Sequence, residues 1–181
     1  MRNLFKIITL TTVILVSGCV TQQEVYTEKG SEAQYKFRPD IPNFYSSIED
    51  VAGKITTRCR NMTIRDLDFL LDVARKSQRQ IDCEGFEYRG KDRFMELMFS
   101  DDELDLVIVL IEQEEYEALS QKFKETYGQP THDSEIGQFY YYDAVAIRTR
   151  PYEVVFTSKR TRANYQVYMD YMARQETDRN Q

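Results

Sequence analysis

LDLVIVLI, residues Leu104–Ile111, is the stretch that decides the fold of this chain. Valine and isoleucine fill its centre, and a continuous apolar run of this length is typical of a central strand covered on both faces. A polar turn, Ser100–Glu103, precedes the run, and a helical pattern begins after it at Glu112. We therefore expect a sheet with Leu104–Ile111 at its centre.

Two further strands are predicted directly before this run. Ile81–Tyr88 and Arg93–Phe99 alternate with period 2, and Arg89–Asp92 has the composition of a turn. Successive strands on short turns pair in antiparallel fashion. The sequence therefore predicts a three-stranded antiparallel meander.

Helical periodicity is predicted on both sides of this meander. Asn43 is a favourable N-cap for a first helix that ends near Arg58, and a second helix is expected to start at Thr63. A third helix is predicted over Glu112–Tyr127, where Gly128 is typical of the position after the last turn.

The C-terminal third predicts two or three more strands, at Gln138–Tyr142, Ala144–Arg150 and Tyr152–Ser158, and a final helix over Thr161–Arg174. The complete order is two helices, three strands, a helix, two or three strands and a helix. This order indicates an α+β single domain, with an antiparallel sheet of five to six strands and helices mainly on one face. The sequence contains no internal repeat.

The N-terminal segment has the pattern of an export signal. Arg2 and Lys6 give a positive start, and the apolar run Ile7–Val16 is too short to span a bilayer, which takes about 20 residues. The run ends in Leu15–Cys19, LVSGC, which resembles the lipobox of bacterial lipoprotein precursors, in which the cysteine is lipidated and becomes the first mature residue. The alternative is an ordinary secretory signal. Val20 stands where lipoproteins retained in the inner membrane typically carry Asp, so the resemblance implies the outer membrane.

These features predict four segments. Residues 1–18 are the lipoprotein signal peptide, and residues 19–42 are a lipidated N-terminus and flexible tether, since they are polar and aperiodic. Residues 43–175 are the globular α+β domain, and residues 176–181 are a frayed tail. We do not assign the mature domain to a family from its sequence.

The net charge and the cysteine count indicate which partners and which redox compartment to expect. A net charge of −6 does not suggest nucleic acid as a partner. Cys59 and Cys83 remain once Cys19 is lipidated, and an even number of cysteines in an exported chain predicts a disulfide. Two buried free thiols are the alternative. No cofactor is expected.

Motifs for catalysis are sparse. The only histidine, His132, stands between Thr131 and Asp133 and could be a metal half-site or a base with a carboxylate partner, but a solvated polar loop is favoured. The acidic residues from Asp101 to Asp105 invite a calcium site, but they lack the glycine of an EF-hand loop. Solvated turn residues are the favoured interpretation, and no metal is expected.

Two surface features, a run of tyrosines and a group of arginines near the final strands, could instead bind a partner. Aromatic and arginine side chains supply most of the binding energy at many protein interfaces. The candidate partner-binding residues are Tyr140, Tyr141, Tyr142, Arg148, Arg150 and Arg160. Their alternatives are burial beneath the last helix for the tyrosines and ordinary solvation for the arginines.

We therefore expect an outer-membrane-anchored, periplasm-facing lipoprotein, held in the membrane through Cys19. Its domain is expected to act as a non-catalytic binding or accessory module with an envelope protein partner, in envelope assembly, in a secretion system, or as an inhibitor or immunity protein. The alternative is a cell-envelope hydrolase that uses carboxylates in an unrecognised arrangement.

Overall fold

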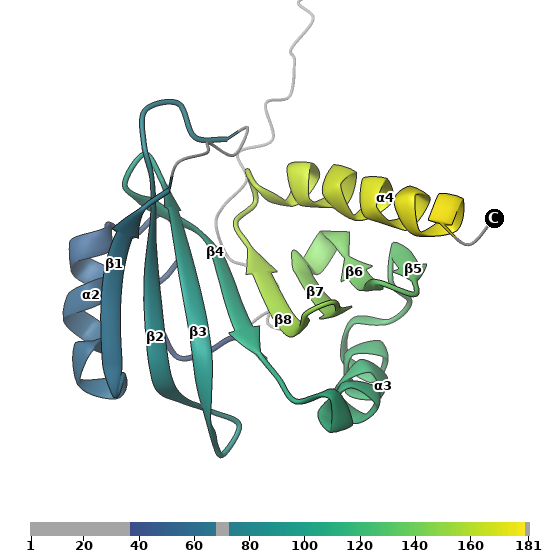
Figure 1. Ribbon diagram of the computed structural model, residues 1–181, viewed down its shortest axis with the longest axis horizontal. Coiled ribbons are helices and arrows are strands. Elements are labelled where there is room, and N and C mark those ends of the chain that lie inside the picture. Colours follow the sequence, from purple (N-terminus) through teal and green to yellow (C-terminus); the bar gives the residue numbers. More distant parts are fainter. Residues whose placement is uncertain (1–36, 68–72, 180–181) are drawn as a thin grey trace, which may run out of the picture.

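The computed structural model describes residues 37–67 and 73–179 (Figure 1). The predicted signal peptide, Cys19 and most of the predicted tether lie outside the described residues. Within them, the chain forms one eight-stranded antiparallel sheet, in the order β1-β2-β3-β4-β8-β7-β6-β5, with three α-helices. The predicted α+β class with an antiparallel sheet is confirmed.

The chain builds the same arrangement twice, a helix followed by four antiparallel strands. The first half contains α2 (Ile48–Ile55), β1 (Asn61–Asp66), β2 (Gln78–Tyr88), β3 (Lys91–Ser100) and β4 (Glu103–Leu110). The second half contains α3 (Tyr116–Tyr127), β5 (His132–Ser134), β6 (Gly137–Tyr140), β7 (Val145–Thr149) and β8 (Tyr152–Thr157). The helix α4 (Arg162–Arg179) follows both. The structure therefore repeats an order of elements, although the sequence contains no internal repeat.

The two halves join in the middle of the sheet, where β4 pairs with β8 from Leu106 opposite Thr157 to Leu110 opposite Glu153. The run LDLVIVLI is thus central, as predicted. Val107 and Val109 are fully buried on one face, whereas Ile108 and Leu110 are only half-buried on the other. The two faces of the sheet therefore differ in how well they are covered.

The main core lies between the sheet and the first two helices. Ile48, Val51 and Ile55 of α2 recur on one side of that helix and are buried, and Leu119 and Phe123 of α3 join the same core. Figure 1 shows α2 beside the β1–β2 end of the sheet and α3 toward its other half.

The opposite face of the sheet is covered by α4 over the second half, where Tyr165 and Met169 pack with Phe139 and Val155. The helices thus cover both faces, two on one and α4 on the other. The prediction of helices mainly on one face did not anticipate this second layer.

The first helix begins at Ile48 with Ser47 as its N-cap, not at Asn43 as predicted. The Ser47 side chain accepts a hydrogen bond from the Asp50 amide. The preceding residues are engaged in the sheet, because the Tyr45 amide donates to the Leu104 carbonyl and the Leu104 amide donates to the Ser46 carbonyl. Backbone pairing with β4 therefore delays the start of the helix.

The prediction of a second helix from Thr63 is wrong. Asn61–Asp66 is a strand, paired along its whole length with β2. The spacing of Ile64 and Leu67 fits a helical stripe, but the cross-strand hydrogen bonds that override it come from residues more than a dozen positions away. The middle of the predicted helix, residues 68–72, lies outside the described residues.

The number of strands is eight, rather than five to six, because short elements were missed. The predicted polar loop at His132 forms the edge strand β5, and β1 replaces a helix at the other edge. The strand predicted over Gln138–Tyr142 ends at Tyr140, and a 3₁₀ turn, Tyr141–Asp143, follows it. The last helix extends to Arg179, beyond its predicted end at Arg174.

Candidate binding surface

The three predicted tyrosines lie in three different environments. Tyr140 is 2% exposed and packs against Phe123 and Tyr127 in the main core. Tyr141 is half-buried beneath the guanidinium of Arg162, whereas Tyr142 is 81% exposed. The run therefore divides into a core residue, a packing residue and one solvent-facing side chain.

Arg148 lies on the face of the sheet opposite Tyr140. Tyr140 pairs with Val145, so these two side chains share a face. Arg148 is three residues after Val145 on β7, and side chains an odd number of residues apart on a strand point to opposite faces. Its guanidinium donates to the Glu153 carboxylate at 2.8 Å and to the Tyr168 hydroxyl at 2.9 Å. Arg150 is exposed at the turn between β7 and β8.

Arg160 is a structural residue at the seam between the two halves. Its Nε and one terminal nitrogen donate to both carboxylate oxygens of Asp105, at 2.7 and 2.8 Å, and Asp105 is fully buried. The other contacts go to the Glu103 carboxylate and the Ser100 carbonyl. The structure therefore does not bring Arg148, Arg150 and Arg160 together as a solvated basic group.

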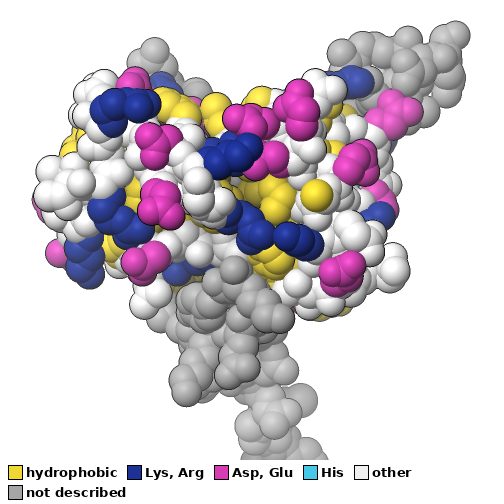
Figure 2. Space-filling view, turned by 90° about the horizontal axis from the view of Figure 1, so that it is seen from below, with side chains coloured by type: hydrophobic (Ala, Val, Ile, Leu, Met, Phe, Trp, Pro, Cys, Tyr) yellow, Lys and Arg dark blue, Asp and Glu magenta, His cyan; other side chains and the backbone are white. Residues whose placement is uncertain are grey.

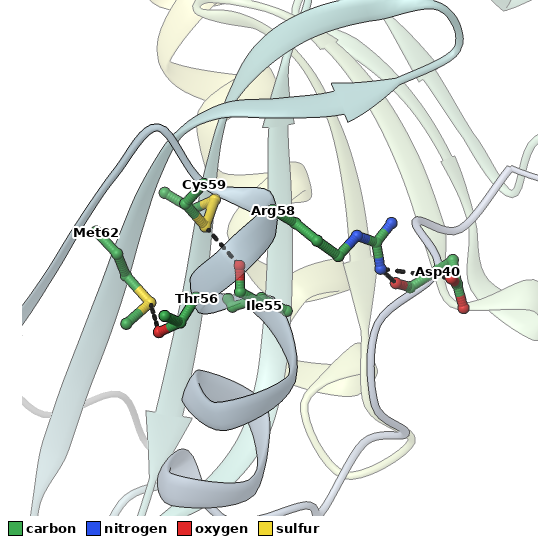
Figure 3. Close-up of a disulfide and its surroundings, with 7 residues drawn as sticks. Asp40, Ile55, Thr56, Arg58, Cys59 and Met62 are labelled. Carbon is green, nitrogen blue, oxygen red and sulfur yellow. Dashed lines mark hydrogen bonds and ion pairs between the residues drawn. A yellow bond between two sulfur atoms is a disulfide. The ribbon is translucent and has the colours of Figure 1, made fainter.

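Cys59 and Cys83 form a disulfide with a Cα–Cα distance of 5.3 Å. Cys59 follows the 3₁₀ turn Thr56–Arg58 at the end of α2, and its Sγ lies 3.3 Å from the Ile55 carbonyl oxygen (Figure 3). Cys83 is buried in β2. The bond fastens the end of α2 to the sheet, and the predicted pairing is confirmed.

In the first half, the sheet face away from α2 joins the cluster under α4 through Met98 and Leu106, with Leu67 and Ile108 packed against it, and no described helix lies over the rest of this face (Figure 1). We call this side of β1–β4, which faces away from α2, the open face. Register places Thr63, Asp82, Glu96 and Ile108 in one row across it. Thr63 is exposed and the other three are half-buried. Half-buried carboxylates at the centre of a sheet require polar partners.

Polar side chains from three adjacent strands form a network on the open face. Arg65 of β1 donates to the Asp82 carboxylate at 2.8 Å, and the Gln80 side-chain amide donates to the same carboxylate at 2.6 Å. Glu96 of β3 interacts with Gln80 and with the Asp82 charge. Burial and the Asp82 charge raise the pKa of Glu96.

This network continues toward the second half through Glu153 and Arg148. Burial raises the pKa of Glu153 to about 7; the Arg148 charge opposes this shift, and repulsion from Glu96 adds to it. We call Arg65, Gln80, Asp82, Glu96, Glu153 and Arg148 the charged band. It crosses the sheet from β1 to β7.

The helix α4 borders the charged band with aromatic side chains. The Tyr168 ring lies under the Arg148 guanidinium, 5.1 Å from ring centroid to Cζ. Tyr168 is 38% exposed, and Tyr171, one turn further along the helix, is 53% exposed. Tyrosines that combine an apolar ring with a polar tip are common at recognition surfaces.

A cavity of about 300 Å³ lies elsewhere, by the turn between β2 and β3, with Phe37, Tyr88, Arg58 and Arg89 in its lining. Figure 2 shows one side of the molecule, where basic and acidic side chains alternate around apolar patches. The lining of the cavity also contains both charges, because Asp40 and Glu87 lie there together with the arginines.

The acidic turn before β4 binds backbone rather than presenting a cation site. The Asp101 carboxylate accepts hydrogen bonds from the amides of Arg75, Lys76 and Ser77, which lowers its pKa. Over the residues that the structure describes, no three His, Cys, Asp or Glu side chains are grouped so that they could hold a metal ion.

Comparisons of the chain with protein-family models, with curated proteins and with solved structures found no match. In residues 37–67 and 73–179 no helix combines the length and the apolar character needed to cross a membrane.

Sequence reasoning missed the charged band, although one signal was present. Asp82, Glu84 and Glu96 alternate with apolar residues in predicted strands, so their common face was readable from period 2 alone. What was not readable is that β8 and β7 would continue the same face, since that depends on the pairing of β4 with β8.

Proposed function

We propose that this protein is an outer-membrane-anchored, periplasm-facing lipoprotein whose domain binds an envelope partner through its open face. The observation that carries the membrane part is the sequence Leu15–Cys19 at the end of a short apolar run. The disulfide Cys59–Cys83 supports it, because such bonds form and persist in oxidising compartments.

The charged band supports the binding part. Its carboxylates and arginines are held by one another, so they are already ordered and lose little further freedom on binding. The flanking Tyr168 and Tyr171 add apolar contact area beside these charges. Of the residues first considered for binding, Arg148 lies in this surface, and Arg160 serves the seam instead.

A hydrolase that uses the two acids of raised pKa, Glu96 and Glu153, is less well supported. The Glu153 side chain is only 4% exposed, and its carboxylate is tied to Arg148. A general acid must reach the atom that it protonates. We therefore assign recognition to the exposed side chains of the open face, Arg65 among them, and we do not assign proton transfer to Glu153.

The test is affinity capture by the native lipoprotein from solubilised envelopes, followed by identification of the captured protein. Thr63→Arg and Glu84→Lys change two exposed positions of the open face, and we expect them together to reduce capture at least tenfold, about 1.4 kcal/mol. Lys54→Glu on the exposed side of α2 is the matched control. Equal capture by both variants, with unchanged melting curves, would place the partner elsewhere.

The anchor is tested separately. Cys19→Ser removes the predicted lipidation site, so we expect the protein to leave the outer-membrane fraction. Retention in that fraction after a high-salt wash would show that lipid does not hold the protein, and it would leave the open-face result intact.

A further inference from the structure

A second constellation of polar side chains lies at the far edge of the sheet, beneath α4. His132 and Ser134 are two residues apart on β5, so both side chains point to the same face. His132 Nδ1 lies 2.9 Å from Oδ1 of Asp170 on α4, and His132 Nε2 lies 3.0 Å from Oγ of Ser134. One imidazole therefore links a carboxylate to a hydroxyl through its two ring nitrogens.

The partners fix what each group can do. A carboxylate at Nδ1 favours the tautomer with its proton on that nitrogen, which leaves Nε2 free to accept the Ser134 hydroxyl proton. The carboxylate is itself oriented, because the Gln166 side-chain amide donates to the same Oδ1 at 2.8 Å. This is the order of roles, nucleophile, base and orienting acid, that serine hydrolases use on unrelated folds.

The local fold holds Ser134 in place. It pairs with Gly137 across a two-residue turn between β5 and β6. Gly137 has φ 138°, and a Cβ there would lie 2.2 Å from the Ile147 carbonyl oxygen, so a larger residue would displace the turn. Since β5 is the last strand of the sheet, Ser134 lies at the sheet edge, where its side chain is half-buried.

We propose that Ser134 is a nucleophile for acyl transfer from carboxylic esters, with His132 as its base and Asp170 as a positioning residue. The Ser134 Oγ–carbon bond forms as the hydroxyl proton moves to His132 Nε2. The ester carbon–oxygen bond then breaks, and the leaving alcohol takes that proton. Water next attacks the acyl carbon, gives a proton to His132 and releases the acid as the acyl–Oγ bond breaks and Oγ regains the proton.

This activity is independent of partner binding at the open face, and its test uses the folded full-length chain. A fluorophosphonate probe reacts with an activated serine by forming a phosphorus–Oγ bond and releasing fluoride. We expect labelling of the wild type at Ser134 by mass spectrometry and hydrolysis of p-nitrophenyl acetate above the buffer rate. Ser134→Ala should abolish both, and Ser77→Ala, at an exposed position, should change neither.

Asp170→Asn keeps a hydrogen-bonding group in place and tests the positioning role. We expect kcat for ester hydrolysis to fall by up to about 10⁴-fold with KM little changed, because an amide at Nδ1 favours the wrong imidazole tautomer. A purely structural contact would lower the melting temperature and leave kcat of the folded protein unchanged. No labelling of the folded wild type, or labelling that survives in Ser134→Ala, would overturn the proposal and leave His132 as a pin between α4 and β5.

Discussion

The two halves of the molecule have the same order of elements but different surroundings. In both, a helix is followed by a four-stranded antiparallel meander, and α2 and α3 contribute to one continuous core. On the other face, α4 packs apolar side chains against Phe139 and Val155 of the second half, whereas the charged band crosses the first half and ends beside α4 at Glu153 and Arg148. The comparison teaches that the extra helix, and not the meander, decides which half covers the second face of its sheet.

The largest expected effect concerns the disulfide, which only the first half has among the described residues. Cys59→Ala with Cys83→Ala removes a cross-link between residues 24 positions apart. Loop-closure entropy predicts a loss of about 3–4 kcal/mol in the free energy of unfolding. Urea denaturation measures it, and hydrogen exchange should show faster opening in β1 and β2 than in β6 and β7. Equally faster exchange in both halves would contradict the claim that the disulfide stabilises mainly the first half.

The next effect concerns the seam, which both halves share. Arg160→Ala leaves the buried Asp105 carboxylate without its main cation. Breaking a buried pair from one side is strongly destabilising, and because Arg160 is partly exposed we expect about 2–4 kcal/mol. Thermal unfolding measures this loss, and Arg150→Ala, at an exposed turn, is the control. Equal melting temperatures for the two variants would show that Arg160 is a surface residue.

A smaller effect is the pH dependence that Glu153 imposes on the charged band. Its folded-state pKa of about 7 lies above the ordinary 4.5, so the folded protein binds this proton more tightly than the unfolded chain. Stability from this group is therefore complete below about pH 4.5 and is lost as the pH rises through about 7.

We expect a decline of roughly 1–3 kcal/mol over that window, on top of the titration of other groups. Glu153→Gln should flatten this part of the curve in urea unfolding measured at half-unit pH steps. Glu87→Gln, at an exposed position, should keep the wild-type slope. Parallel curves for all three proteins would contradict the raised pKa.

The sequence predicted the long strands and missed one strand in each half of the sheet, β1 and β5, for physical reasons. β2, β3 and β4 are long, so their alternation and the apolar run Leu104–Ile111 stand out over many residues. β5 has three residues, too few for any period to show, and β6, with four, was predicted as a strand but two residues too long at its end. Their pairing is set by Gly137 and by packing under α4, which are properties of the tertiary structure.

The same distinction holds for the candidate sites. The disulfide could be predicted by counting cysteines in a chain that is expected to be exported, because that argument needs no geometry. The role of Arg160 could not, since a guanidinium in a polar stretch looks solvated until Asp105, 55 residues away, is brought beside it. His132 likewise gained a carboxylate from Asp170 on the last helix, not from its neighbour Asp133.

Photo-crosslinking in the envelope tests the central claim, that the open face of the first half is the binding surface. A photoreactive phenylalanine analogue is placed at Thr63 or Glu84 on the open face, and at Lys54 on the exposed side of α2 as the control. We predict a discrete crosslinked product from both open-face positions and none from α2. Crosslinks to the same partner from Lys54 alone would contradict the account, because they would place recognition on the helical side of the first half.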